Sequence, residues 1–174
     1  GRPVWYHLPP MNGYGGRILF IDVSSGETRI EPVSEGHARA LLGGNGFAVR
    51  LLLDHVPAGV DPLDPANVVV FAVGPVTDST VPGNSRACVA TKSPLTGLFF
   101  DSTFGGRFPA TMKRTGWDAI VITGQAREPV YVRVTEDGAT LRPARGLMGK
   151  TTRDTVHAIQ EAEGASADVI AIGP

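Results

Sequence analysis

Between residues 81 and 116 the sequence concentrates groups that bind anions. This stretch contains one acid, Asp101, and five cations, which are Arg86, Lys92, Arg107, Lys113 and Arg114. Five minus one gives it a charge of +4, although the whole chain carries −1. It also holds glycines and hydroxyl side chains, among them Gly83, Gly97, Gly105, Gly106, Ser85, Thr91, Ser93, Thr96, Ser102 and Thr103. Cations, exposed backbone N–H groups and hydroxyls together predict an anion site with phosphate as the expected ligand; the alternative is a solvated basic loop.

Two glycine-rich segments lead to different interpretations. Gly105 and Gly106 precede a predicted helix, where backbone N–H groups and the positive helix end favour a phosphate; the alternative is a tight turn. Residues 43–46 (GGNG) contain Gly44 and Gly46, but Val49 stands at the third glycine position of a dinucleotide fingerprint. The segment also follows a helical pattern instead of a strand, so we interpret it as a helix break or a close helix contact.

No residue of the chain is predicted to be catalytic. Cys88 lies in a predicted strand between apolar neighbours, which is typical of a buried, unreactive thiol. The four histidines are far apart and lack metal-ligand spacing, and no Ser/His/Asp set or paired carboxylates stand out. A single cysteine excludes an intrachain disulfide and an iron–sulfur cluster ligated by this chain alone.

Strands and helices that position these groups can be predicted from hydrophobic periodicity and from turn residues. Strands are expected at Arg17–Val23, Glu27–Val33, Asn67–Val73, Arg86–Thr91, Leu98–Asp101, Ala119–Thr123, Val130–Thr135, Thr140–Arg142 and Asp168–Ile172. Helices are expected after a Ser34 cap, over Phe47–Leu53, over Gly105–Thr115 with Pro109 in the first turn, and from Thr151 or Thr152 to Glu163. Proline-rich residues 56–66 read as a loop, and Asp137-Gly138 predicts a hairpin turn.

The mixture of hairpins and interspersed helices predicts an α+β (mixed α/β) fold with a mixed sheet. One sequence echo suggests two related halves, because FAVGP at 71–75 recurs as IAIGP at 170–174. In each copy a predicted buried strand ends in Gly-Pro. The second copy has no following loop, which suggests a fragment or one piece of a larger assembly.

Composition excludes several classes of protein. Hydrophobic residues make up 42% and charged residues 19% of 174 residues, values typical of one globular domain. The balanced charge argues against a nucleic-acid partner, and no apolar run reaches the about 18 residues of a membrane span. Residues 1–10 lack a signal-peptide pattern and read as an extension or a cloning remnant before the domain at 11–174. A cytoplasmic location is therefore expected.

Several motifs together resemble one known family, the N-terminal domain of the tungsten-containing aldehyde:ferredoxin oxidoreductases. The matching stretches are GYGGRILFIDVSSGE from Gly13, LLGGNGFAVRLL from Leu41, VVVFAVGPVTDSTVPGNSRACVATKSPLTG from Val68, DSTFGGRF from Asp101, MKRTGWDAIVITGQAREPVYV from Met112, LMGK from Leu147 and AIGP from Ala171. They cover nearly all of residues 11–174. The family pattern has Thr-Gly-Thr after the first Gly-Pro, where this chain has Thr77, Asp78 and Ser79.

The resemblance implies a β-sheet base with pseudo-twofold halves that carries two pyranopterins. These hold one tungsten, or molybdenum in some relatives, and their phosphates are bridged by magnesium. It places the pterin-contacting arginine on Arg86 and the phosphate loop on Thr103, Phe104, Gly105 and Gly106, with the Thr103 backbone carbonyl as a magnesium ligand. Contacts to the second pterin begin at Gly173 and Pro174.

The resemblance also implies what this chain does not carry. The iron–sulfur cysteines and the residues acting near tungsten belong to later domains of the family, so aldehyde oxidation with ferredoxin requires those domains or a partner subunit. The first hypothesis is therefore a cofactor-binding domain that is incomplete alone. The alternatives are a free-standing structural or interaction module without cofactor, including a homodimer, and a general phosphate- or nucleotide-binding domain.

Overall fold

The computed structural model describes residues 11–174; the extension expected at residues 1–10 lies outside the described part. The strands of this part are β1 Arg17–Asp22, β2 Thr28–Pro32, β3 Val68–Val73, β4 Ala87–Lys92, β5 Phe99–Phe104, β6 Trp117–Thr123, β7 Val130–Thr135 and β8 Gly138–Pro143. Its helices are α1 Glu35–Leu41, α2 Asn45–His55, α3 Phe108–Arg114, α4 Thr152–Glu163 and the short 3₁₀ helix η2 Arg145–Leu147. None of them has the length and apolarity needed to cross a bilayer.

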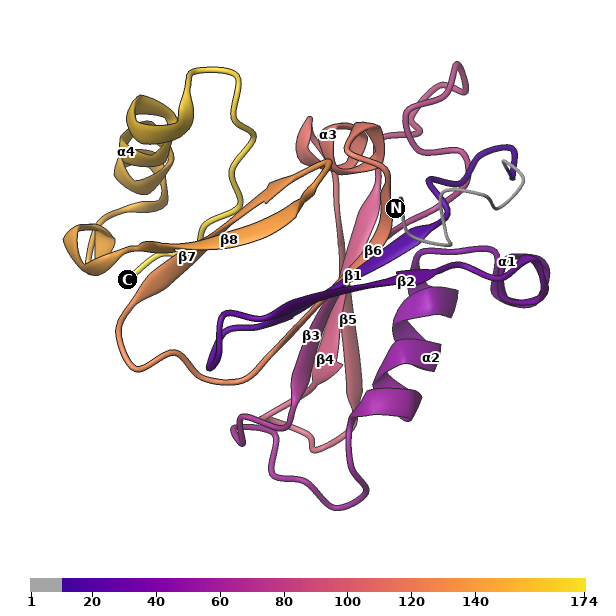
Figure 1. The fold of residues 1–174 in the computed structure, drawn as a ribbon, viewed down its shortest axis with the longest axis horizontal. Helices are drawn as coiled ribbons and strands as arrows, with labels where there is room; N and C mark the ends of the chain where they lie inside the picture. Colours follow the sequence, from indigo (N-terminus) through magenta and orange to yellow (C-terminus); the bar gives the residue numbers. More distant parts are fainter. Residues whose placement is uncertain (1–10) are drawn as a thin grey trace, which may run out of the picture.

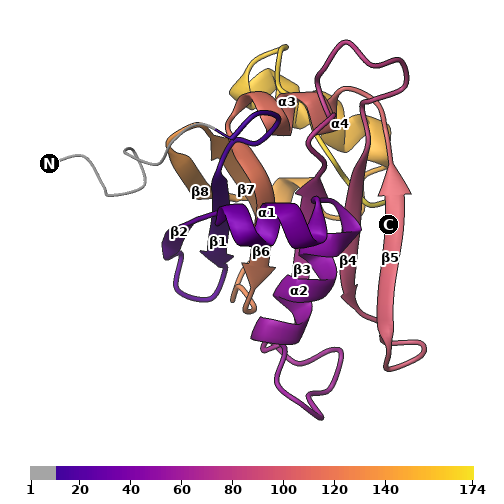
Figure 2. The same ribbon diagram turned by 90° about the vertical axis from the view of Figure 1, so that its right-hand side faces the viewer.

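Six strands form one sheet in the order β2-β1-β6-β3-β4-β5, and β7 and β8 form a separate hairpin. All neighbours in the large sheet are antiparallel except the parallel pair β1 and β6. Helices α1 and α2 lie on one side of the large sheet, whereas β7, β8 and α4 lie on the other (Figures 1 and 2). The mixed α/β class predicted from the sequence is confirmed.

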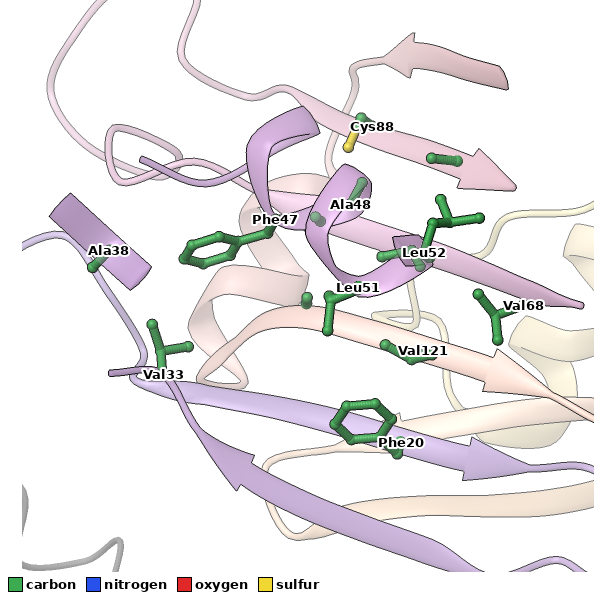
Figure 3. Close-up of a cluster of buried hydrophobic side chains, with 14 residues drawn as sticks. Phe20, Val33, Ala38, Phe47, Ala48, Leu51, Leu52, Val68, Cys88 and Val121 are labelled. Atoms are coloured by element: carbon green, nitrogen blue, oxygen red, sulfur yellow. The ribbon is translucent and has the colours of Figure 1, made fainter. Parts of the chain in front are cut away.

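Alternating side chains of the central strands build two cores, one on each face. Helix α2 covers the first core with Phe47, Ala48, Leu51 and Leu52, which pack against strand residues such as Val121 (Figure 3). The second core lies between the sheet, α3 and the β7–β8 hairpin, and its largest member is the fully buried Trp117. Trp117 therefore has a packing role in this core.

Local sequence signals account for several boundaries. The Ser34 hydroxyl accepts a hydrogen bond from the His37 N–H at 3.1 Å and begins α1 as predicted. Thr151 caps α4 in the same way, and a proline occupies the first turn of α3. A methyl group added at Gly46 would lie 2.1 Å from the Leu41 carbonyl oxygen, so the expected close helix contact at residues 43–46 is confirmed.

Two strand predictions need correction. The short strand expected at Leu98–Asp101 continues to Phe104, because its whole length pairs with β4. The strand expected at Asp168–Ile172 is wrong: these residues have no regular secondary structure and join neither sheet. An apolar run becomes a strand only when another strand satisfies its backbone hydrogen bonds, and residues 11–174 supply none beside this segment.

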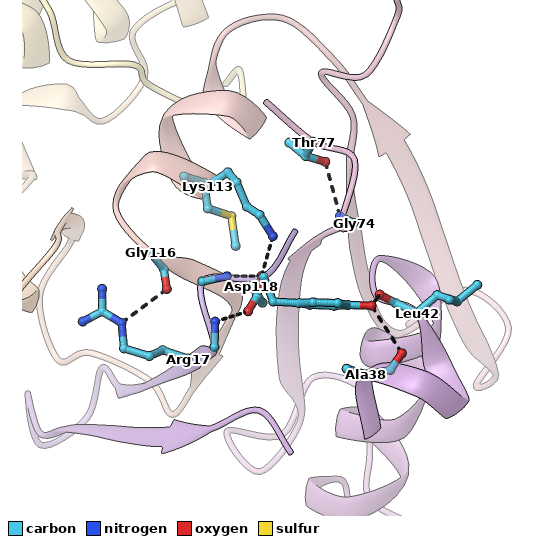
Figure 4. Close-up of polar contacts among 12 residues, drawn as sticks. Arg17, Ala38, Leu42, Gly74, Thr77, Lys113, Gly116 and Asp118 are labelled. Carbon is cyan, nitrogen blue, oxygen red and sulfur yellow. Dashed lines mark hydrogen bonds and ion pairs between the residues drawn. The ribbon is translucent and has the colours of Figure 1, made fainter. Parts of the chain in front are cut away.

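Arg17 joins the large sheet to the β7–β8 hairpin. Its guanidinium lies over the Trp117 ring, 4.2 Å from the ring centre, and donates to the Thr115 carbonyl at 2.9 Å. Figure 4 shows its hydrogen bond to the Gly116 carbonyl. Arg17 also donates to the Glu136 carbonyl at 3.1 Å, in the turn between β7 and β8. One side chain thus fixes the hairpin over the second core.

Candidate functional site

The segments with candidate binding residues gather at one end of the large sheet, which we call the α3 end. Strands β3 and β5 finish there, β1, β4 and β6 begin there, and α3 lies over it (Figure 1). The loop that joins β3 to β4 projects from this end. Antiparallel pairing of β3, β4 and β5 therefore brings Arg86 close to Gly105, although 19 residues separate them in the chain.

Arg86 lies directly beside the glycine turn. A methyl group added at Gly105 would lie 3.3 Å from the Ser85 carbonyl oxygen and 3.6 Å from Arg86 Nη1. Gly106 has a φ of +85° with open space beside it, and its carbonyl accepts the Ser85 hydroxyl at 2.5 Å. Within residues 11–174 no carboxylate forms an ion pair with Arg86, which is exposed. An exposed guanidinium beside an open glycine backbone fits an anionic ligand.

The β3–β4 loop holds the backbone of Arg86 in place. The buried Thr77 hydroxyl donates to the Arg86 carbonyl at 3.1 Å and accepts the Gly74 N–H at 3.3 Å (Figure 4). Asn84 spans the loop, because its amide donates to the carbonyls of Ser79 and Val81 at 2.6 Å each. Sequence analysis missed this positioning role, which depends on tertiary contacts.

Asp78 stands where the resemblance implies a glycine, and its backbone conformation suits a glycine as well. Its φ is +61°, a left-handed conformation that glycine adopts without strain. Arg114 of α3 donates to both carboxylate oxygens of Asp78, at 2.6 and 2.8 Å, and this contact holds the pKa of Asp78 below its ordinary value. The acid therefore faces α3 and forms the contact that holds the loop on that helix.

Only part of the basic stretch contributes to a common anion site. Lys92 lies at the far end of β4, about 20 Å from Arg86 at 3.3 Å per residue, and donates to the Val60 carbonyl. Lys113 pairs with Asp118, and Arg114 with Asp78. The prediction that all five cations form one site is wrong, because these three are engaged elsewhere. Arg107, which follows the glycine turn, forms an ion pair with Asp168 at 3.5 Å, so Arg86 is the one cation at this turn without a carboxylate partner in residues 11–174.

Thr103 and Phe104 are the last two residues of β5, not part of a loop. Thr103 is exposed, whereas the Phe104 ring packs against Phe71 and Phe108, with ring centres 6.3 and 6.1 Å apart. Only backbone atoms of Phe104 therefore face a ligand. Because β5 is an edge strand, alternate carbonyls point away from β4, as a cation ligand must.

Gly173 and Pro174 do not lie with Arg86, Gly105 and Gly106, which we call the Arg86 cluster. Both are exposed, and a methyl group added at Gly173 would contact only Thr152, at 4.0 Å, where α4 begins. The C-terminus lies on the β7 and α4 side of the molecule (Figure 1). The structure thus separates the two expected binding segments and places α3 beside the first of them.

A buried carboxylate at the start of β6 binds both α3 and the segment that precedes β1. Asp118 is fully buried and accepts the N–H groups of Gly15 and Gly16 at 3.1 and 2.7 Å, and the Lys113 ammonium at 2.6 Å (Figure 4). Sequence analysis missed this centre, because Asp118 sits within an apolar strand pattern. The pKa of the nearby Tyr14 hydroxyl is raised, mainly because the group is partly buried and secondly because the Asp118 charge lies close to it.

The Cys88 thiol should be unreactive in the folded chain. Cys88 is buried in β4, and burial raises its pKa from 9.0 to about 11. We expect a disulfide reagent at pH 8 to label the native thiol at least a hundredfold more slowly than the thiol in urea. Because the folded pKa is the higher one, stability should be constant below pH 9 and fall between pH 9 and 11. Fast native labelling would contradict the buried placement.

Comparisons with known proteins agree on one family. The sequence model described as aldehyde ferredoxin oxidoreductase, N-terminal domain, matches residues 18–174. The tungsten-containing aldehyde ferredoxin oxidoreductases of Thermococcus kodakarensis and Pyrococcus horikoshii are 39% and 37% identical to the chain, over 94% of its length. The chain spans 27% of the length of each. The active site complex BamBC of benzoyl coenzyme A reductase has a similar fold, with a TM-score of 0.84, 30% identity, and coverage of 87% of this chain and 23% of that one.

Proposed function

Because the chain belongs to the aldehyde ferredoxin oxidoreductase N-terminal domain family, we propose that it binds a tungsten pterin cofactor at the α3 end. One observation carries the proposal: the exposed Arg86 guanidinium, without a carboxylate partner in residues 11–174, lies beside Gly105, and the backbone of the next residue, Gly106, is open. Pterin cofactors of this kind bear phosphate, which a guanidinium and glycine N–H groups bind well.

The residues at the α3 end fit such a group by their chemistry. Arg86 supplies fixed positive charge and a fork of donors, and the absence of a side chain at Gly105 and Gly106 lets a flat, anionic group approach the backbone. The backbone carbonyl of Thr103 is our proposed magnesium ligand, since Mg²⁺ prefers oxygen donors next to phosphate. When bound, the cofactor supplies the redox chemistry, while this chain binds it and sets its electrostatic surroundings.

The activity of the whole protein forms a further part of the proposal. We propose that aldehyde oxidation with transfer of electrons to ferredoxin requires domains beyond the quarter of its relatives' length that this chain spans. A molybdenum cofactor in place of tungsten remains an alternative. We keep a cytoplasmic location and the absence of nucleic-acid and membrane partners as predictions from the sequence.

The exposed edge of β5 favours a protein partner as well. Phe99 and Phe100 are 43% and 51% exposed, Leu98 is 69% exposed, and one edge of the strand pairs with nothing in residues 11–174 (Figure 2). Aromatic side chains on an open edge are typical of a surface that another chain segment covers. We propose that catalytic domains, a partner subunit or a second copy covers this edge.

Native mass spectrometry tests the proposal directly. The chain is produced in a host that makes the pterin cofactor and is supplied with tungstate. We expect added mass that matches pterin and metal, and loss of this mass after magnesium is removed with a chelator. A clean apo mass would contradict cofactor binding, and the number of chains in the same spectrum would then support or refute an interaction module.

A further inference from the structure

Helix α3 contacts the segment that leads to Gly173. Asp168 of this segment accepts a hydrogen bond from the Thr111 hydroxyl of α3, and its Oδ1 lies 3.5 Å from Arg107 Nε. The Asp168 side chain is only 11% exposed, whereas Arg107 is 78% exposed. A second contact holds the start of the segment, because the Gln160 amide of α4 donates to the Ala167 carbonyl at 3.0 Å.

The same helix also fixes the two segments that form the Arg86 cluster. It begins two residues after Gly106, and Arg114 at its end binds Asp78 in the loop that leads to Arg86. The hydrogen bond and charge of Asp78 raise the pKa of Arg114, and the more distant Asp168 charge adds to this shift. One seven-residue helix therefore contacts the loop before Arg86 on one side and the segment before Gly173 on the other.

The contact of Asp168 differs from an ordinary surface ion pair. Exposed pairs such as Arg39 with Glu35 contribute little, because water solvates both groups equally well when they separate. The Asp168 carboxylate is nearly buried, and its short-range donor is the neutral Thr111 hydroxyl. Without that hydroxyl, the only partner left to the nearly buried carboxylate is the exposed Arg107 at 3.5 Å. The segment must then move so that water can solvate the carboxylate.

We propose that Asp168 is a positioning residue that fixes the segment of Gly173 and Pro174 on α3, in register with the Arg86 cluster. The inference rests on the proposed function, together with the expectation from the resemblance that Gly173 and Pro174 contact the second pterin of the same cofactor. Under this arrangement, Asp168 and Asp78 set the distance between the two binding segments through a shared helix. Breaking the Asp168 contact releases one segment and leaves the Arg86 cluster in place.

The test removes the Thr111 hydroxyl without changing the shape of the side chain. Thr111→Val deletes the donor, and Thr111→Ser is the matched control that keeps it. Limited digestion of the native chain with a nonspecific protease should cleave within residues 165–174 at least tenfold faster in the valine variant and within threefold of the unchanged chain in the serine variant. Hydrogen exchange over residues 84–87 should be unaltered in both. Unchanged cleavage in the valine variant would overturn the anchoring.

Cofactor loading separates positioning from simple anchoring. Both variants are produced in the pterin-making host with tungstate, and native mass spectra give the loaded fraction. We expect the valine variant to load at least fivefold less than the serine variant. Equal loading with faster cleavage would overturn the positioning role, whereas no loading of the unchanged chain would overturn the proposed function instead. Should Thr111→Val not fold, Asp168→Asn makes the same comparison with the same expectations.

Discussion

Replacing Asp118 with asparagine should lower the free energy of unfolding by about 3–5 kcal/mol. The carboxylate is 0% exposed and its partner Lys113 only 10% exposed, so the substitution leaves an ammonium buried without a counter-charge. The amide group also replaces an oxygen that accepts an N–H from Gly15 or Gly16, and a donor then faces a donor. Urea unfolding, with the slope checked for two-state behaviour, measures the loss.

The loss should extend to the candidate site, because Asp118 holds the segment beneath it. Gly13 packs against Pro75, where an added methyl group would lie 2.8 Å from the carbonyl oxygen. Pro75 begins the loop that leads to Arg86. Hydrogen exchange over residues 74–86 should therefore rise in Asp118→Asn before the chain unfolds globally.

An exposed ion pair provides the control. Glu35 and Arg39 are 66% and 78% exposed and form an i,i+4 pair on α1. Glu35→Gln removes the same kind of charge and should change stability by no more than about 0.5 kcal/mol. If Asp118→Asn costs no more than this control, the centre of Asp118 and Lys113 does not stabilise the α3 end.

Features encoded by neighbouring residues could be predicted from the sequence. The Ser34 cap and the start of α4 depend on residues within one turn of each other, and the structure has both. The hairpin turn predicted at Asp137-Gly138 forms one residue earlier, at Glu136 and Asp137, because Gly138 already pairs with Thr135 in the hairpin. Alternation in β1 and β2 likewise predicts a hairpin, because a two-residue period fixes which side chains face the core.

Features that depend on tertiary partners could not be predicted in this way. The length of β5 is set by its pairing with β4, and residues 168–172 are not a strand because no strand lies beside them. The charge count predicted five cations at one site, but it could not show that Asp118 and Asp78 engage two of them. Lys92 is excluded from the site as well, because it lies at the opposite end of β4 from Arg86.

Replacing Arg86 with glutamine should reduce tungsten pterin binding about tenfold to a hundredfold. The estimate follows from about 1.5–3 kcal/mol for a hydrogen bond to a charged group, at 1.4 kcal/mol for each factor of ten. Glutamine keeps a polar side chain of similar reach but removes the charge and the paired donors. The backbone should stay in place, because the Thr77 hydroxyl binds the Arg86 carbonyl whatever the side chain is.

A control variant at Arg127 shows whether this result is specific to Arg86. Arg127 is also exposed and forms no ion pair within residues 11–174, but it lies in the loop between β6 and β7, so Arg127→Gln removes the same charge elsewhere. We expect full cofactor loading in that variant and unchanged stability, within about 0.5 kcal/mol, in both. Equal loading of the two glutamine variants in native mass spectra would show that net charge, not the position of Arg86 beside Gly105, determines binding.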